Sequence, residues 1–200
     1  MHKVVRRPGA AVFERELAFV FCSDENGSQV VRKANAPGEA SKAMSINEPA
    51  DLASISPSGN WITWVDPPGH LVILNVATGE INKVRDPGEI LSAASWSPDD
   101  RHLLVEAFDW GAPEIYMIDV TDGRALRLTA TNRGEGMPAW SPDGARVVTV
   151  SQREGKPALW MHDHVQEYIT LLKNADAPGV FERPARLKIP APPGARRFRN

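Results

Sequence analysis

Hydrophobic and polar positions alternate along this chain in short runs that turn residues separate. Three such runs are WITWV at 61–65, RHLLVEAF at 101–108 and RVVTVS at 146–151. Runs of β-branched, aromatic and leucine residues bounded by Gly, Pro, Asp or Ser predict β-strands. Helical spacing is not sustained, and 165–173 is the one stretch that the periodicity leaves open between helix and strand. The pattern therefore predicts an all-β chain.

A turn of one design precedes each of these runs. The three turns are SPSG at 56–59, SPDD at 97–100 and SPDG at 141–144. Proline presets φ at the second position, a carboxylate can cap the turn, and the last position accepts a left-handed conformation. Two later turns, at 77–79 and 121–123, follow the apolar runs HLVILNV and EIYMIDV. Tight turns between strands predict antiparallel hairpins.

The strands recur with a period. Aligned on the strand after each turn, Ala18, Ile62, Leu103 and Val147 are spaced by 44, 41 and 44 residues. Periods of about 40–45 residues with four strands each indicate the blades of a β-propeller. We therefore expect propeller blades of four antiparallel strands within 11–189. The expected units are 11–49, 50–90, 91–135, 136–178 and a partial fifth blade at 179–189, between a basic N-terminal segment (1–10) and a tail rich in Pro and Arg (190–200).

A second internal match bears on ring closure. The tetrapeptide VFER at 12–15 recurs at 180–183, 168 residues later, which is four periods of 42. The chain after Gly179 therefore resembles a new blade, with 185–189 as its second strand. Because unpaired strand edges promote aggregation, we expect an incomplete ring that a second copy or blades outside this sequence complete.

Two segments carry a family resemblance. PAWSPDGARVVTVS at 138–151 and EIYMIDVTDGRALRLT at 114–129 resemble the repeats of TolB-like β-propellers, which also form the N-terminal propellers of prolyl-oligopeptidase-type enzymes. The resemblance is strong over 91–164 and weak over 11–46. It implies that Trp96 and Trp140 are buried at equivalent positions of neighbouring blades.

The resemblance also implies a class of function, a non-catalytic scaffold for protein–protein interaction. Two alternatives stay open: the propeller of a hydrolase whose catalytic domain is absent from this chain, and a propeller enzyme acting on a small ligand. The chain has no Gly-x-Ser-x-Gly elbow, phosphate loop or recognisable triad. We therefore expect no enzyme activity and no cofactor.

Composition sets further limits. A chain of 200 residues with 42% hydrophobic content can form one domain with a sizeable core. The longest apolar run, 17–22, is far below the roughly 20 residues of a membrane span, so we expect a soluble protein. Charges at 14–16 interrupt the apolar stretch that a signal peptide needs. This favours the cytoplasm unless a leader lies outside this sequence, whereas the resemblance suggests the periplasm.

The net charge of −2 conceals an uneven distribution. Residues 1–7 carry +3, residues 182–200 carry +5, and the remainder carries −10. Solubilising charge at the chain ends is the simpler interpretation, and contact of these ends with anionic surfaces is the alternative. We do not expect nucleic acid to be a partner.

Two motifs resemble metal sites. His162 and His164 share one face of a strand and could hold zinc, but no further ligand stands at a suitable spacing. DENGS at 24–28 begins like a calcium loop but lacks the required glycine and glutamate further on, so we expect a hairpin turn there. No metal is expected.

The loop surface is where a partner should bind. In a propeller, the loops between second and third strands and those between blades share one face. Here they are 66–70, 108–111 and 132–136, and they carry the candidate contact residues His70, Trp110, Arg133 and Glu135. Trp110 is the best candidate, because an aromatic side chain in a Gly/Pro-rich loop offers a large rigid surface. The simpler interpretation is that it folds over its own blade.

Overall fold

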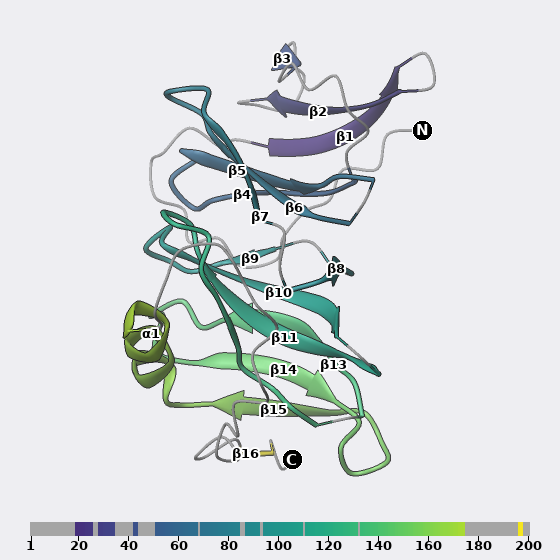
Figure 1. Cartoon of the computed structure of the whole chain (residues 1–200), viewed down its shortest axis with the longest axis vertical. Coiled ribbons are helices and arrows are strands. Elements are labelled where there is room, and N and C mark those ends of the chain that lie inside the picture. The colour runs from purple at the N-terminus through teal and green to yellow at the C-terminus, as the bar shows by residue number, and fades with distance from the viewer. Residues whose placement is uncertain are drawn as a thin grey trace.

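The computed structural model describes residues 19–25, 28–34, 42–43, 51–67, 69–84, 87–92, 94–109, 111–131, 133–174 and 196–197. Their strands form four antiparallel sheets of three to five strands. Figure 1 shows the sheets stacked in chain order, with the first sheet at the top and the fourth at the bottom. The expected propeller-type repeat of antiparallel sheets is confirmed.

The first two sheets come from the N-terminal part of the chain. The first sheet contains β1 (Phe19–Glu25), β2 (Ser28–Ala34) and β3 (Lys42–Ala43). Pairing of Glu25 with Ser28 closes the hairpin that was expected in place of a calcium loop. The second sheet runs in the order β4 (Asp51–Ile55), β5 (Trp61–Val65), β6 (Leu71–Asn75) and β7 (Ile81–Val84).

The other two sheets depart from a simple four-stranded blade. In the third sheet, β8 (Glu89–Ile90) and β9 (Ser95–Trp96) both pair with β10 (His102–Asp109), and β11 (Ala112–Asp119) and β12 (Ala125–Arg127) follow. The fourth sheet contains β13 (Glu135–Trp140), β14 (Val147–Ser151) and β15 (Ala158–His162), with β16 (Arg196–Arg197) at its edge. The innermost strand of the third sheet is thus divided into two short segments.

The Ser-Pro turns adopt the expected geometry. The amide of the last turn residue donates to the carbonyl of the serine, at 3.0 Å for Gly59, 3.1 Å for Asp100 and 2.9 Å for Gly144. All three residues have positive φ, as a left-handed turn position requires. Asp100 also reaches the neighbouring turn, because its carboxylate accepts a hydrogen bond from the amide of Ser58 at 3.2 Å.

The stretch that the sequence left open is a helix. α1 (Val165–Asn174) follows β15, at the place in the chain where a fourth strand was expected. It buries Val165, Tyr168, Ile169 and Leu172 in an apolar cluster with the third and fourth sheets. Packing of this amphipathic face stabilises a helix there. The edge of the fourth sheet is occupied instead by β16, which pairs with Trp160 and Met161.

The two repeated tryptophans differ in burial. Trp96 is 3% exposed, in an apolar cluster between the second and third sheets. Trp140 holds the equivalent position, opposite Val147 as Trp96 is opposite Leu103, but it is only partly buried. Its indole nitrogen donates to the carbonyl of Ser95 at 3.2 Å. The expectation of two buried indoles is correct for Trp96 and holds only in part for Trp140.

The described strands form an open stack. No described strand of the first sheet pairs with one of the fourth, which is consistent with an incomplete ring. The expected fifth-blade segment (179–189), both VFER segments and the basic segment 1–10 lie outside the described residues, as does the tail apart from 196–197. No helix in the described part of the chain combines the length and hydrophobicity that a membrane span needs.

Candidate partner-binding site

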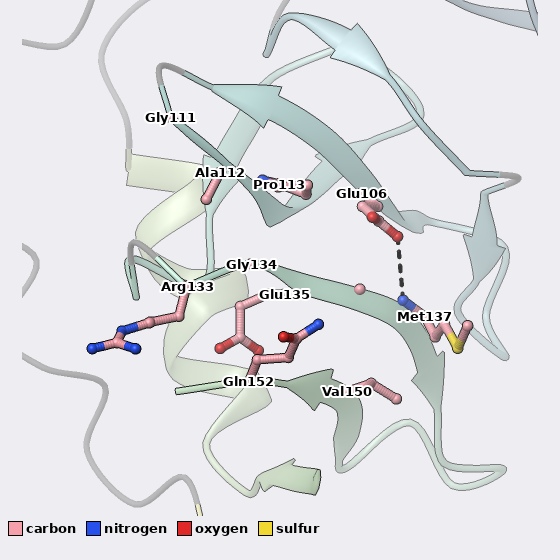
Figure 2. Close-up of a pocket in the computed structure, with 11 residues that line it drawn as sticks. Glu106, Gly111, Ala112, Pro113, Arg133, Gly134, Glu135, Met137, Val150 and Gln152 are labelled. Atoms are coloured by element: carbon pink, nitrogen blue, oxygen red, sulfur yellow. Dashed lines mark hydrogen bonds between the residues drawn. The ribbon is translucent and has the colours of Figure 1, made fainter. Parts of the chain in front are cut away.

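A pocket of about 480 Å³ lies between the third and fourth sheets (Figure 2). The connection from β10 to β11 and the segment leading into β13 form much of its wall. Two of the three loop segments expected to carry partner contacts therefore come together here. The lining residues are Glu106, Gly111, Ala112, Pro113, Arg133, Gly134, Glu135, Gly136, Met137, Val150 and Gln152.

Met137 is the exposed apolar residue of this pocket. Its side chain is 76% exposed and its φ is +51°. A β-bulge lies between Gly136 and Ala139, and bulges re-aim side chains. Leu52 has φ +53° beside a similar irregularity in β4, but it packs against the apolar cluster between the second and third sheets. Strands β4 and β13 therefore share the bulge. The side chain at positive φ is packed in β4 but exposed beside the pocket in β13.

The carboxylate of Glu135 forms the buried side of the pocket. Glu135 is 1% exposed, and its Oε1 lies 2.8 Å from Nη2 of Arg153. Its Oε2 accepts a hydrogen bond from the Thr149 hydroxyl at 3.0 Å. A buried carboxylate needs such partners, because an unpaired charge in a protein interior is costly. The role of Glu135 as a contact residue stays a prediction. Its charge is already paired within the chain, with Arg153.

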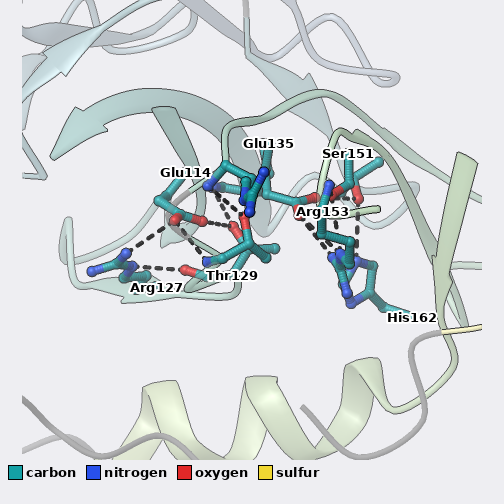
Figure 3. A network of polar contacts seen from close by, with 11 residues as sticks. Glu114, Arg127, Thr129, Glu135, Ser151, Arg153 and His162 are labelled. Atoms are coloured by element: carbon teal, nitrogen blue, oxygen red, sulfur yellow. Dashed lines mark hydrogen bonds and ion pairs between the residues drawn. The ribbon is translucent and has the colours of Figure 1, made fainter. Parts of the chain in front are cut away.

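A second buried carboxylate holds the segment that leads into the pocket (Figure 3). Glu114 is 1% exposed and pairs with Arg127, with 3.1 Å between Oε1 and Nη2. It accepts hydrogen bonds from the Thr129 hydroxyl at 2.6 Å and from the Thr131 amide at 2.9 Å. Fully satisfied polar networks make a local structure rigid. The Glu114 carboxylate therefore anchors the segment between β12 and β13 to the third sheet.

His162 belongs to the Glu135 network. It is 3% exposed, and its Nε2 lies 3.3 Å from the Thr149 hydroxyl. Burial, together with the positive charge of Arg153, lowers the pKa of His162 to about 4. The ring is therefore neutral at pH 7. The Arg153 guanidinium also lies 4.1 Å from the centre of the Trp160 ring.

The second histidine of the His162/His164 motif has different surroundings. His164 lies just before α1, and its Nδ1 is 3.1 Å from Glu167. The residues that the structure describes contain no group of three or more His, Cys, Asp or Glu side chains placed to hold a metal ion. The motif therefore separates into one buried and one exposed imidazole.

His70 lies in the connection between β5 and β6 and is not among the residues that line the pocket. Its amide donates to Oδ1 of Asp66 at 2.9 Å, and Lys83 lies 3.4 Å from Oδ2. Burial raises the pKa of Asp66, but the hydrogen bonds from His70 and Lys83 outweigh it, and the pKa lies below its ordinary value. The histidine thus takes part in closing its own loop. Trp110 lies outside the described residues.

Arg133 and Glu106 complete the polar lining. The side chain of Arg133 is exposed and extends away from Glu106 and Met137 in Figure 2. Glu106 was not singled out in the sequence, although its carboxylate faces Met137 across the pocket, where the Met137 amide donates to Oε2 at 3.4 Å. Alignment of the repeats could have identified Glu106, because it stands where two other repeats have a valine, Val65 and Val150.

Comparisons with known proteins place these features in a family. The TolB beta propeller domain model matches residues 9–175. A protein TolB homolog of Chlorobium chlorochromatii is 28% identical over 138 residues, which cover 67% of this chain and 31% of that protein. An uncharacterized peptidase, YuxL of Bacillus subtilis, is 40% identical over 63 residues, which cover 30% of this chain and 10% of the peptidase.

A solved structure agrees with the sequence relatives. TolB of Acinetobacter baumannii superposes with a TM-score of 0.58 at 24% identity, over 68% of this chain and 35% of that one. The chain thus spans about a third of the length of the TolB proteins that it matches. The family model extends across the repeats of all four sheets, and the chain belongs to the TolB β-propeller domain family.

Proposed function

We propose that this chain is a non-catalytic scaffold that binds a protein partner at the pocket between the third and fourth sheets. One observation carries the proposal: Met137 is exposed beside a pocket whose buried side holds the ion pair of Glu135 with Arg153. Leu52 shares the positive φ, so the exposure of Met137 and not its backbone conformation distinguishes this site.

The chemistry of the pocket suits a protein surface. Methionine is flexible and polarisable, so it adapts to partners of different shape. Arg133 adds an exposed guanidinium at the rim. Aromatic residues, methionine and arginine are enriched where proteins meet. Membership of the TolB family supports the same interpretation.

A second candidate function is the propeller of a hydrolase whose catalytic domain lies outside this sequence. The 40% identity to a peptidase over 63 residues favours it. The complete reading frame decides between the two: a hydrolase domain encoded in the same frame would support the second candidate. Neighbouring genes for envelope proteins would support the scaffold.

The incomplete ring bears on assembly. We propose that a second copy of the chain, or blades outside this sequence, complete it, because an open stack leaves strand edges unpaired. Light scattering coupled to size exclusion on the purified chain tests the first alternative. A dimeric mass supports completion by a second copy. A stable monomer with its first and last sheets hydrogen-bonded together contradicts an open ring.

The binding proposal is tested by capture with matched surface variants. Met137→Glu and Arg133→Glu alter the pocket rim, and Arg146→Glu makes the same charge reversal on the turn at 141–146. Arg146 is 48% exposed and lies 3.6 Å from Asp143, an exposed pair that contributes little to stability. Tagged proteins are incubated with extract of the source cells, and bound proteins are quantified by mass spectrometry.

We expect a protein captured by the unmodified chain to be retained by Arg146→Glu and lost, at least tenfold, from both pocket variants. The three variants should have melting temperatures close to that of the unmodified chain, because each changes an exposed side chain. Equal capture by all four proteins would contradict binding at this pocket. Hydrolysis of peptide or ester substrates by the purified chain would contradict a non-catalytic role.

A further inference from the structure

Glu106 differs from the other carboxylates around the pocket. It lies on β10, on the side that faces the fourth sheet, and is partly buried. Its carboxylate accepts one hydrogen bond in the described part of the chain, from the Met137 amide at 3.4 Å. A carboxylate can accept about four hydrogen bonds, so Glu106 can accept others from a ligand. Glu135, by contrast, is paired with Arg153.

The repeat supplies an internal reference for this position. The equivalent residues are Val65 in β5 and Val150 in β14. Val65 is 7% exposed and belongs to the apolar cluster between the second and third sheets. The fold is therefore satisfied by valine at this point. Glu106 is only partly buried and lines the pocket, so a carboxylate that the fold does not require is presented where a partner can reach it.

Gly136 makes room for the carboxylate. A Cβ at this position would lie 2.8 Å from Oε2 and 3.2 Å from Cδ of Glu106. Glycine is the residue that permits such a close approach. The Glu106 side chain and the β13 backbone are therefore fitted to each other, and the carboxylate is presented beside the exposed Met137 (Figure 2).

We infer that Glu106 is the receptor for a basic side chain, lysine or arginine, of the partner protein; this rests on the proposed function. The carboxylate takes the cationic end through a charge-assisted hydrogen bond. The aliphatic stem of the same side chain packs on Met137, since long basic side chains bury their methylene groups on apolar surface. Charge complementarity thus selects a basic segment of the partner for this part of the pocket.

The test is a titration of the purified chain with Nα-acetyl-lysine amide, followed by chemical shifts of the backbone amides. Nα-acetyl-norleucine amide is the control ligand, because it has an aliphatic stem without the charge. We expect the Gly136 and Met137 amides to shift with the lysine compound and not with norleucine. Since binding depends on charge, the affinity should fall as salt is added.

Three variants locate the effect. Glu106→Gln removes the charge and keeps the shape, and Gly136→Ala keeps the charge but displaces the carboxylate. Each should weaken lysine binding about tenfold, the scale of one hydrogen bond to a charged group. Glu80→Gln removes a charge from an exposed turn of the second sheet and should leave the affinity unchanged. Unchanged spectra away from the pocket establish that each variant is folded.

Equal affinity of the unmodified chain and Glu106→Gln would overturn the inference, as would an equal response to norleucine. Broadening of the same amides by micromolar Mn²⁺ without any response to lysine would overturn it in favour of a metal site. The capture experiment can fail independently: a captured partner with no response to lysine overturns only this inference. Lysine binding without a captured partner overturns only the proposed function.

Discussion

The two inter-sheet interfaces of the third sheet are built from different chemistry. On the side of the second sheet the centre of the contact is an apolar cluster, with the buried side chains Val65, Leu71, Ile73, Val84, Ile90, Ala94, Trp96, Leu103, Val105, Ala107, Tyr116, Ile118 and Val120. On the side of the fourth sheet an apolar cluster around α1 gives way to the buried ion pair of Glu135 with Arg153.

The register shows where the change occurs. Val105 and Ala107 of β10 correspond to Thr149 and Ser151 of β14, and all four side chains are buried. Antiparallel backbone pairing continues through both strands. Backbone hydrogen bonds therefore maintain the repeat while the side chains between sheets vary. The two polar replacements, Thr149 and Ser151, adjoin the pocket residues Val150 and Gln152.

Truncation of a side chain in the apolar interface should have the largest effect on the free energy of unfolding. Trp96→Ala should lower the free energy of unfolding by about 3–5 kcal/mol, because a buried indole is replaced by a cavity. Trp140→Ala, at the equivalent but partly buried position, should cost about 2 kcal/mol. Urea unfolding followed by fluorescence or circular dichroism measures both. Equal losses in the two variants would contradict the difference between the interfaces.

Loss of the ion pair between Glu135 and Arg153 should have the next largest effect on the free energy of unfolding. Arg153→Met should cost about 3 kcal/mol, because it leaves the Glu135 carboxylate buried without its charge partner. Adding Glu135→Gln should restore part of the loss, since the uncompensated charge is then removed. Urea unfolding of the two single variants and the double variant gives the coupling free energy. Additive losses would mean that the two side chains do not depend on each other.

The sequence predicts more of the fold than of the candidate site. The Ser-Pro turns and alternating runs predict the sheets because their information is local. The sequence does not distinguish helix from strand at α1, because its apolar residues suit either element until the surface on which they pack is known. The position of β16 depends on pairing with Trp160 and Met161, which are distant in sequence.

The contact residues of the candidate site stay a prediction. Arg133 and Glu135 were placed on the binding face from loop order, and both line the pocket. The ion pair of Glu135 with Arg153 joins residues on two strands, so neither spacing nor composition indicates it. Glu106 could have been found, since it replaces a valine of two other repeats. Its exposure and its neighbour Met137 required the structure.

The polar interface should also make the stability of the protein depend on pH, through His162. The pKa of His162 falls from 6.5 to about 4 in the folded protein, so the unfolded chain binds more protons between these values. Its contribution to stability is complete above about pH 6.5 and is lost as the pH falls. The loss should reach about 2 kcal/mol by pH 5.

The control for this effect is His162→Gln, which keeps the size of the side chain and removes its titration. Burial also lowers the pKa of His102, against the pull of Asp99 and Asp119, and that group acts in both proteins. The difference between the two unfolding curves, measured from pH 7.5 to 5, isolates His162. Parallel curves would show that His162 does not titrate as described.

The smallest expected effect concerns contact between turns. Asp100→Gly keeps the positive φ of that position but removes the carboxylate that accepts hydrogen bonds from Ser58 and Ser56. The expected loss is about 1 kcal/mol, the net value of ordinary hydrogen bonds. Thermal unfolding should show a shift of a few degrees. A more stable variant would mean that this contact between the turns does not contribute.

The proposed function requires that the pocket between the third and fourth sheets, and not another exposed apolar site, meets the partner. Site-specific photocrosslinking tests it most directly, with p-benzoylphenylalanine at Met137 or, as a matched control, at Ile81, which is 46% exposed in the second sheet. We expect a covalent adduct with one partner protein from position 137, absent from position 81 and lost when Arg133→Glu is added. Equal adducts from both positions, or an adduct from position 81 alone, would contradict it.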